Sequence, residues 1–466
     1  MAVLSGLFAR TPHSALFRIS ALAVLLLALA SYYLAELAAV RPAYNMGYLT
    51  MTQYSLMAVA MLTAWKSAPE AISFKDIRWL LVVAVLARVL LIDAGSYASN
   101  DVDRYLFDGR IAVEGLDPYR VSHDALQLQE LRAQWQPPSE HAKYVTLYPP
   151  LALGLFSLAA SFGLEHALLA WKLIILSASL ATLFISAKVL EHAGKLQHLS
   201  LIAFSPLLIL EANIGLHIDA ISTFTVVAAL YLWQRQRIAL TGIAIGLGTA
   251  IKVVPIMLLL PLIFTLPSVK AAAKLVVSSL VTVVVIYLVT LNLGLHPVGS
   301  IGVFFEKWRF AAPLFVTLDQ MFNGYQILII MLIFAAVLAL CIALFLWKKS
   351  LWKERQWQDK SQLFFAAQIA VAIPLLISPV IFPWYLMPLL PLLALAPNRY
   401  LILWTLLMPL TYEVLNGFLS ERLWQPAAWP VWLVGLVQLA AVIAVVRYFY
   451  REWQHRKTIN RDIHVQ

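Results

Sequence analysis

Long apolar runs separated by short polar intervals make up most of this sequence. A run of about 20 apolar residues predicts a membrane-spanning helix, because only a helix satisfies its own backbone groups inside the hydrocarbon. The pattern predicts spans at residues 19–40, 48–65, 79–95, 167–190, 199–212, 218–233, 240–251, 253–266, 275–295, 325–347, 362–378, 385–396, 400–416 and 431–446. The expected fold class is therefore an all-α polytopic membrane protein with about 14 transmembrane helices (12–14).

One polar interval, residues 96–147, interrupts this pattern and contains eight of the chain's 24 acidic residues. It predicts a large first outer loop that carries short surface helices. The next segment, 148–164, begins Tyr-Pro-Pro and is short for a crossing, so we expect a re-entrant or surface helix whose first turn is fixed by Pro149 and Pro150.

The chain thus divides into four parts. Residues 1–95 hold three N-terminal transmembrane helices, and 96–164 hold the outer loop with the re-entrant or surface helix. Residues 165–446 hold the remaining helices with a second outer loop at 296–324, and 447–466 form a basic tail. Several predicted spans are much shorter than 20 residues, which is typical of helices broken around a cavity.

Composition agrees with a membrane protein: 62% of the residues are hydrophobic, 12% are charged and the mean hydropathy is +0.80. The net charge of +10 is explained by basic cytoplasmic loops, so we expect the lipid bilayer, and no nucleic acid, as a partner. Arg10, Arg18 and the basic stretches at 348–360 and 447–461 place both termini in the cytoplasm and the interval 96–147 outside. The single cysteine, Cys341, excludes an intrachain disulfide.

Polar residues from position 101 onward follow a helical spacing. Four of them share one face, at i, i+3, i+4 and i+7: Asp101, Arg104, Tyr105 and Asp108. Asp103 points about 200° away from this face. Gly109 or Gly115 would end the helix. A purely structural interpretation remains open, in which Asp101 complements the helix dipole and pairs with Arg104.

The motifs that follow make a recognisable series. An acidic residue is followed by Arg104-Tyr105, then by F-D-G-R at 107–110, G-L-D-P-Y at 115–119 and Y-P-P at 148–150. This order resembles the first outer loop of membrane-embedded type C glycosyltransferases, especially bacterial polyprenol-phosphate-mannose-dependent mannosyltransferases. Weaker matches are Glu211, G-L-H-I-D-A at 215–220, G-T-A-I-K at 248–252 with Pro255, and P-W-Y-L at 383–386. The chain departs from the family in its two extra leading spans and in lacking an asparagine after W-R-F at 308–310.

The resemblance implies an enzyme that moves a mannose-like hexose from a polyprenyl-phosphate donor to an acceptor hydroxyl on a lipid or glycan, at the outer face of a bacterial inner membrane. An inverting displacement needs a carboxylate that accepts the hydroxyl proton and a positive group that holds the departing phosphate. By its motif position Asp101 is the expected catalytic base. The expected substrate-binding residues are Arg104, Tyr105, Asp108, Arg110, Tyr119, Tyr148, Lys172, His217, Asp219, Lys252 and Tyr385.

Two of these residues, Lys172 and Lys252, lie within apolar segments, where a lysine is costly unless it faces water or a partner. Both are candidates for the phosphate, and snorkelling to the interface is the alternative for each. Arg88 is expected to pair with Asp93. A divalent metal at Asp101 and Asp103 is conceivable, but their opposite faces argue against it, so no metal and no cofactor are expected.

Two other classes of protein remain in competition. A transporter of lipid-linked sugars would place titratable pairs at the membrane midplane and show paired halves. A polysaccharide polymerase or ligase would depend on outer arginine and histidine residues. The concentration of carboxylates in one aqueous interval favours the transferase.

Overall fold

The computed structural model describes residues 13–40, 45–69, 77–140, 142–322, 361–421 and 424–463. Within these ranges the regular structure is helical, apart from one isolated β-bridge between Phe310 and Val380. The predicted all-α class is confirmed for this part of the chain.

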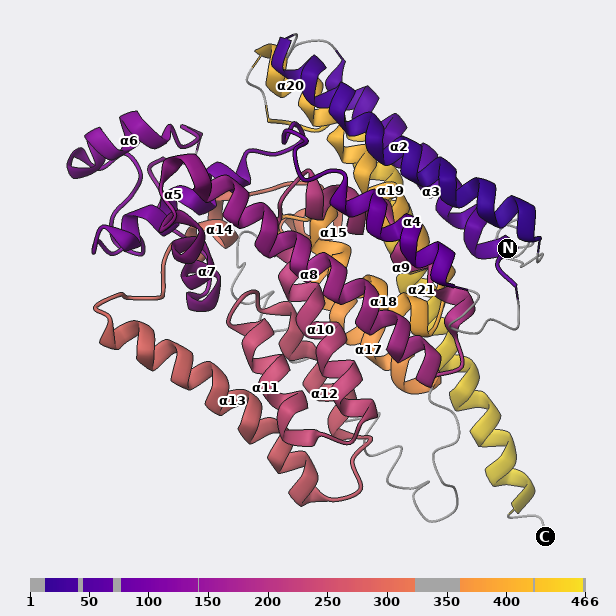
Figure 1. Ribbon diagram of the computed structural model, residues 1–466. Coiled ribbons are helices and arrows are strands. Elements are labelled where there is room, and N and C mark those ends of the chain that lie inside the picture. Colours follow the sequence, from indigo (N-terminus) through magenta and orange to yellow (C-terminus); the bar gives the residue numbers. More distant parts are fainter. Residues whose placement is uncertain are drawn as a thin grey trace.

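The N-terminal part is a helical hairpin with a third helix beside it (Figure 1). Helices α2 (Ser14–Val40) and α3 (Met46–Ser67) pack along their lengths, and α4 (Arg78–Val89) packs on α2. Gln53 of α3 donates from one amide nitrogen to the Leu27 carbonyl and the Ser31 hydroxyl of α2. This polar contact between apolar helices fixes their register.

The polar interval forms short helices, as expected: α5 (Asp101–Val113), η1 (Leu126–Leu128) and α6 (Gln129–Trp135), followed by α7 (Pro150–Ala160). Helix α7 begins at Pro150, as the proline pair predicts. Helices α5 and α7 cross closely at Gly109, where a Cβ atom would overlap the backbone of Phe156. Gly109 therefore serves packing inside α5, and it is Gly115, with φ of 77°, that follows the end of the helix.

The central part is built on the long helix α8 (Leu164–His192). It continues through η2 (Leu196–His198), α9 (Ser200–Ala203) and the π-turn η3 (Leu207–Glu211) to α10 (Asp219–Gln234). Helices α11 (Ile238–Thr249), η4 (Val254–Leu258), α12 (Leu259–Ile263) and α13 (Val269–Asn292) follow. Helix α10 packs between α8 and α11, and α13 covers α11 (Figure 1).

The C-terminal part contributes α14 (Ile301–Lys307), α15 (Pro313–Met321), α17 (Ser361–Leu376), η5 (Pro383–Leu389) and α18 (Leu390–Leu395). Next come α19 (Arg399–Leu407), η6 (Met408–Glu413), α20 (Val414–Glu421) and α21 (Ala428–Ile463). Segment η5 packs on α10 and η3, and η6 packs on α3. These two contacts bring the C-terminal part against the centre and against the N-terminal hairpin.

Fourteen spans are not confirmed. Among the described residues, five helices are long and apolar enough to cross a membrane: Ser14–Val40, Leu164–His192, Val269–Asn292, Arg399–Leu419 and Ala428–Arg447. Three predicted short spans are broken instead, 199–212 into α9 and η3, 253–266 into η4 and α12, and 385–396 into η5 and α18. Hydropathy alone does not detect such breaks. The predicted span 325–347 lies outside the described residues.

In Figure 1 the N-terminal end of α2 and the C-terminal end of α21 lie on the right-hand side, and α5 and α6 lie at the upper left. Helix α7 has 11 residues, a rise of about 16 Å, against a hydrocarbon thickness of about 30 Å. Its length fits a surface or re-entrant helix, which stays a prediction. The five long apolar helices indicate a membrane protein.

Candidate active site

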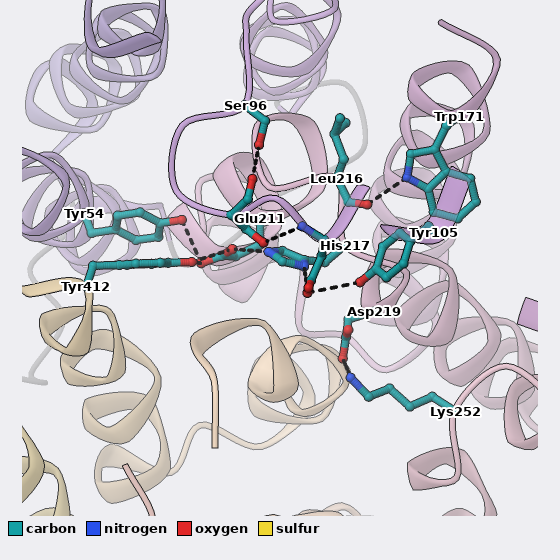
Figure 2. A network of polar contacts seen from close by, with 12 residues as sticks. Tyr54, Ser96, Tyr105, Trp171, Glu211, Leu216, His217, Asp219, Lys252 and Tyr412 are labelled. Carbon is teal, nitrogen blue, oxygen red and sulfur yellow. Dashed lines mark hydrogen bonds and ion pairs between the residues drawn. The ribbon is translucent and has the colours of Figure 1, made fainter. Parts of the chain in front are cut away.

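Side chains from four separate segments meet in the interior, and Figure 2 labels Tyr105, Glu211, His217, Asp219 and Lys252 among them. The segments are the first turns of α5, the stretch from the end of η3 to the start of α10, the turn after α11, and η5. We call this group the Asp101 cluster; it consists of Asp101, Tyr105, Glu211, His217, Asp219, Lys252, Trp384 and Tyr385.

Asp101 is the first residue of α5, and its backbone N–H donates to the Ser99 hydroxyl at 3.1 Å. The positive end of the helix dipole favours an ionised carboxylate at this position. The Tyr105 hydroxyl donates to Asp101 Oδ2 at 3.4 Å. Asp103 is exposed, whereas Arg104, Tyr105 and Asp108 are buried, so the predicted difference between the two faces of α5 is confirmed.

His217 lies between two carboxylates, in the loop between η3 and α10 and outside the five long spans. Its Nδ1 is 3.5 Å from Asp101 Oδ2, and its Nε2 is 3.4 Å from Glu211 Oε2. These are charge contacts rather than aligned hydrogen bonds. Burial alone would lower the pKa of His217, but the two carboxylates outweigh burial and raise this pKa to about 9. His217 is therefore charged at neutral pH.

The local backbone explains how the imidazole reaches this place. The π-turn η3, a form that is frequent at functional sites, ends at Glu211. A Cβ atom at Gly215 would lie 2.7 Å from His217 Nε2 and 3.0 Å from the Glu211 carbonyl oxygen. Leu216 adopts a left-handed conformation with φ of 56°, and its carbonyl accepts a hydrogen bond from Trp171 Nε1 at 2.9 Å. Gly215 and Leu216 together turn His217 back toward Glu211.

Glu211 is fully buried and accepts hydrogen bonds from two tyrosine hydroxyls. Tyr54 of α3 donates at 2.7 Å, and Tyr412 of η6 donates to the two carboxylate oxygens at 2.7 and 2.9 Å. Figure 2 shows Glu211 between these tyrosines and His217. Charged carboxylates are rarely buried without such partners, so helices from both ends of the chain stabilise this side of the cluster.

Lys252 and Asp219 form the other side of the cluster. Lys252 Nζ lies 2.5 Å from Asp219 Oδ1 and 3.8 Å from the centroid of the Tyr385 ring. The lysine side chain keeps 20% of its surface exposed, and that of Asp219 keeps 1%. An ammonium group held between a carboxylate and an aromatic face, and still reachable from outside, is suited to contact an anionic substrate.

Aromatic rings fix Tyr105, and through it the start of α5. Tyr105 stacks on Phe156 at 4.6 Å and meets Trp171 and Tyr148 edge-on at 5.8 and 5.1 Å. Tyr148 also places its hydroxyl 3.4 Å from that of Tyr105. On the cluster's opposite side the ring of His217 stacks on Trp384 at 3.7 Å. Such contacts limit the freedom of the groups that carry the charges.

Arg104 is buried, with its guanidinium carbon 5.9 Å above the Trp308 ring. One terminal guanidinium nitrogen has no hydrogen-bond partner among the described residues. Arg104 lies close enough to Tyr148 and Tyr385 to interact with both of them electrostatically. A buried arginine with an unused donor near the cluster can bind an anion.

Residues 14–268 match the family model of the alpha-(1->6)-mannopyranosyltransferase N-terminal domain. This match covers more than half of the chain. The chain belongs to this mannosyltransferase family. The resemblance seen in the sequence motifs is thereby confirmed, and the protein is a mannosyltransferase of the membrane glycosyltransferase type. No curated protein and no solved structure matches the chain.

The family match of the mannosyltransferase ends before α13. It includes Asp101, Glu211, His217 and Lys252, but the η5 residues of the cluster lie beyond it. The charged groups of the site thus all come from the matched domain, and η5 adds aromatic residues from the C-terminal part.

Two predicted substrate-binding residues of the mannosyltransferase have partners outside the cluster. Asp108 Oδ1 lies 2.7 Å from His123 Nε2, with both side chains buried. Arg110 forms an ion pair with Glu114 one helical turn later, and its guanidinium lies over the Trp135 ring. The contacts with His123 and Trp135 join α5 to the rest of the polar interval 96–147.

Tyr119 and Lys172 also have structural contacts. The Tyr119 hydroxyl donates to the Tyr148 carbonyl at 2.9 Å. Lys172 Nζ donates to the carbonyls of Ile92 and Ala94 at 2.8 and 3.0 Å, just after the end of α4. These contacts explain why a lysine is tolerated within α8, and its role in substrate binding stays a prediction.

Arg88 does not form the expected pair with Asp93. It donates to the Ser179 hydroxyl of α8 at 3.1 Å and to the carbonyls of Ala203 and Ile202 at 3.0 and 3.2 Å. The carbonyls at the end of a short helix need donors, and Arg88 supplies them at the end of α9.

Sequence reasoning missed Glu211 as a site residue and noted it only as a weak match. Its signal is a carboxylate within the apolar stretch L-L-I-L-E-A-N, which marks a functional position in a membrane protein. Tyr54 and Tyr412 carried no comparable signal, because tyrosine is common near membrane interfaces, and Trp384 was marked only by the weak P-W-Y-L match at 383–386.

Across the described ranges, no group of three or more histidine, cysteine, aspartate or glutamate residues is arranged to hold a metal ion. That no cofactor is needed stays a prediction.

Proposed function

We propose that this mannosyltransferase moves mannose from a polyprenyl-phosphate donor to an acceptor hydroxyl by an inverting displacement, with Asp101 as the base. One observation carries this proposal. Of the three carboxylates in the cluster, Asp101 keeps 29% of its side chain exposed, against 0% for Glu211 and 1% for Asp219. Asp101 is the carboxylate that an incoming hydroxyl can reach.

In the proposed step the acceptor oxygen attacks the anomeric carbon of the donor sugar. Its proton passes to the Asp101 carboxylate as the new C–O bond forms. The bond between the anomeric carbon and the phosphate oxygen breaks, and its electron pair leaves with the polyprenyl phosphate. Ionised Asp101 is suited to this role because it lies at the positive end of α5 and beside charged His217.

The departing phosphate gains negative charge and needs cations placed in advance. Lys252 and Arg104 are suited to this role. Lys252 lies against the ring of Tyr385, and Arg104 interacts electrostatically with the same tyrosine. Lys252 is partly exposed, and Arg104 has an unused guanidinium donor within the described structure. Contacts from both sides of the phosphate would lower the barrier to its departure.

We further propose that the protein lies in a bacterial inner membrane, with both termini in the cytoplasm and the cluster open to the periplasmic face. The distribution of lysine and arginine along the chain supports this orientation. So does the position of α5 away from both chain ends in Figure 1. A donor in the outer leaflet would then reach the cluster without crossing the membrane.

The test uses purified protein in lipid vesicles with polyprenyl-phosphate mannose labelled in the sugar. We expect transfer of label to an added mannoside acceptor, with release of one polyprenyl phosphate per mannose transferred. Transfer from a nucleotide-linked mannose, with none from the lipid-linked donor, would contradict the proposed donor class.

A further inference from the structure

We propose that Glu211 and His217 are positioning residues for Asp101. In this arrangement the Glu211 carboxylate keeps His217 in its doubly protonated form, and the imidazolium fixes the direction of the Asp101 carboxylate and keeps it ionised. The inference rests on the proposed function, in which Asp101 is the base. It extends the site to a residue in the membrane protein's interior that does not reach the substrate.

The first support is the pair of atoms that face the imidazole. Asp101 Oδ2 lies 3.5 Å from Nδ1, and Glu211 Oε2 lies 3.4 Å from Nε2. An ionised carboxylate can only accept a hydrogen bond, whereas a neutral imidazole has one donor nitrogen and one acceptor nitrogen. A neutral His217 would therefore turn a lone pair toward one of the two carboxylates. Only the imidazolium satisfies both.

The second support is the surroundings of the ring. His217 is fully buried, and it stacks on Trp384 with 10° between the ring planes. An aromatic face stabilises a cation that lies against it. The imidazole lies against the position that a Cβ atom at residue 215 would occupy, so only glycine at this position leaves room for the ring. The ring is thus held in one orientation between its two partners.

The third support comes from the partners of Glu211 on the side away from His217. Two tyrosine hydroxyls donate to Glu211, one from α3 and one from η6. Both hydrogen bonds fix the position of the Glu211 carboxylate. Glu211 has no exposed surface, so it acts on the site through His217. The order of contacts is tyrosine pair, Glu211, His217, Asp101.

The groups that face His217 come from every element packed around it. Helix α5 contributes Asp101 and Tyr105, η3 contributes Glu211, and α10 contributes Asp219 with its partner Lys252. Two cations and three carboxylates thus share the cluster. Loss of the proton from His217 would leave three carboxylates against one ammonium group, and Asp101 Oδ2 would lose its positively charged neighbour.

The experiment measures kcat/KM for mannose transfer against pH. The unmodified protein is expected to lose activity at high pH, as His217 loses its proton. Glu211→Gln removes one of the two charges that hold this proton. We therefore expect the alkaline limb of the profile to move to lower pH by about one unit or more. Glu211→Asp, which keeps the charge, should bring the alkaline limb most of the way back to its original pH.

Glu165→Gln is the matched control, since it makes the same chemical change at an exposed position near the start of α8. Its profile should coincide with that of the unmodified protein. A merely structural role for Glu211 predicts a lower rate at every pH with the alkaline limb unmoved, and that result would overturn the proposal.

A second variant covers the case in which Glu211→Gln does not fold. His217→Gln cannot titrate, so the alkaline limb should disappear and the remaining rate should be low. Persistence of the same limb in His217→Gln would also overturn the proposal. Absence of transfer by the unmodified protein from the polyprenyl-phosphate donor would instead contradict the proposed function, so the two failures are distinguishable.

Discussion

At the scale of single residues, Lys252 and Lys172 both lie within apolar segments, but their ammonium groups have different partners. Lys252 is paired with Asp219 next to Asp101, whereas Lys172 donates to two backbone carbonyls after α4. Because a charged side chain is costly in an apolar segment, the sequence predicted that each lysine contacts a partner or water. It could not separate them, because their partners come from segments 33 and about 80 residues away.

Lys252→Met should weaken binding of the lipid-linked donor by about 1.5 to 3 kcal/mol, through loss of a charge-assisted contact with the phosphate. Lys172→Met should leave donor affinity unchanged and lower the melting temperature, because it removes donors from the Ile92 and Ala94 carbonyls. Fluorescence titration of a labelled polyprenyl-phosphate sugar measures both affinities. Equal affinity in the Lys252→Met variant and the unmodified protein would exclude Lys252 from the phosphate site.

Protonation of His217 predicts how stability depends on pH. Its pKa is raised from 6.5 to about 9 in the folded protein. A raised pKa means that the folded state binds the proton more tightly, so this contribution is fully present below pH 6.5 and is lost as pH rises through about 9. The melting temperature in detergent should fall between these values, and His217→Gln should reduce the fall. An equal fall in both proteins would show that other groups cause it.

At the scale of elements, the helix predicted after residue 100 is confirmed as α5. It could be predicted because its charged and aromatic residues follow a strict helical spacing. The loop between η3 and α10 could not be predicted in the same way. Its shape depends on the π-turn, on the left-handed Leu216 and on the contact of Gly215 with His217. None of these has a periodic pattern in the sequence.

Gly215→Ala should displace the His217 ring, since the added methyl group overlaps it and the Glu211 carbonyl. We expect a loss of at least about tenfold in transfer rate, because small misplacements of a catalytic group are costly. Gly154→Ala is the matched control, since a Cβ atom at this α7 position meets nothing within 4 Å. It should keep full activity. Unchanged activity of Gly215→Ala would contradict the role given to this turn.

At the scale of the whole molecule, hydropathy predicted the class of protein and the polar interval with its short helices, whereas the predicted number of crossings is not confirmed. Segments such as η4 with α12 and η5 with α18 are apolar throughout, yet they change helix type within a few residues. Prolines such as Pro255 and Pro383 begin some of these irregular turns. Apolar composition alone therefore does not determine where one span ends and the next begins.

Orientation in the membrane can be tested with single cysteines in a Cys341→Ala background. Ser139, exposed in the outer loop, and Gln236, exposed between α10 and α11, should lie on opposite sides. In intact cells a membrane-impermeant thiol reagent should label a cysteine at Ser139 and should label one at Gln236 only after lysis. Labelling of Gln236 alone in intact cells would reverse the orientation.

The central claim is that Asp101 is the base, and the comparison of Asp101→Asn with Asp103→Asn tests it most directly. Both substitutions replace a carboxylate by an amide of the same shape, two residues apart on α5. Asp101 contacts His217 and Tyr105, whereas Asp103 is exposed on the other face. Single-turnover transfer of labelled mannose is measured with equal amounts of monodisperse protein. We expect Asp101→Asn to lose about 10² to 10⁴ in rate while donor binding persists, and Asp103→Asn to retain most activity. An active Asp101→Asn beside an inactive Asp103→Asn would contradict the account.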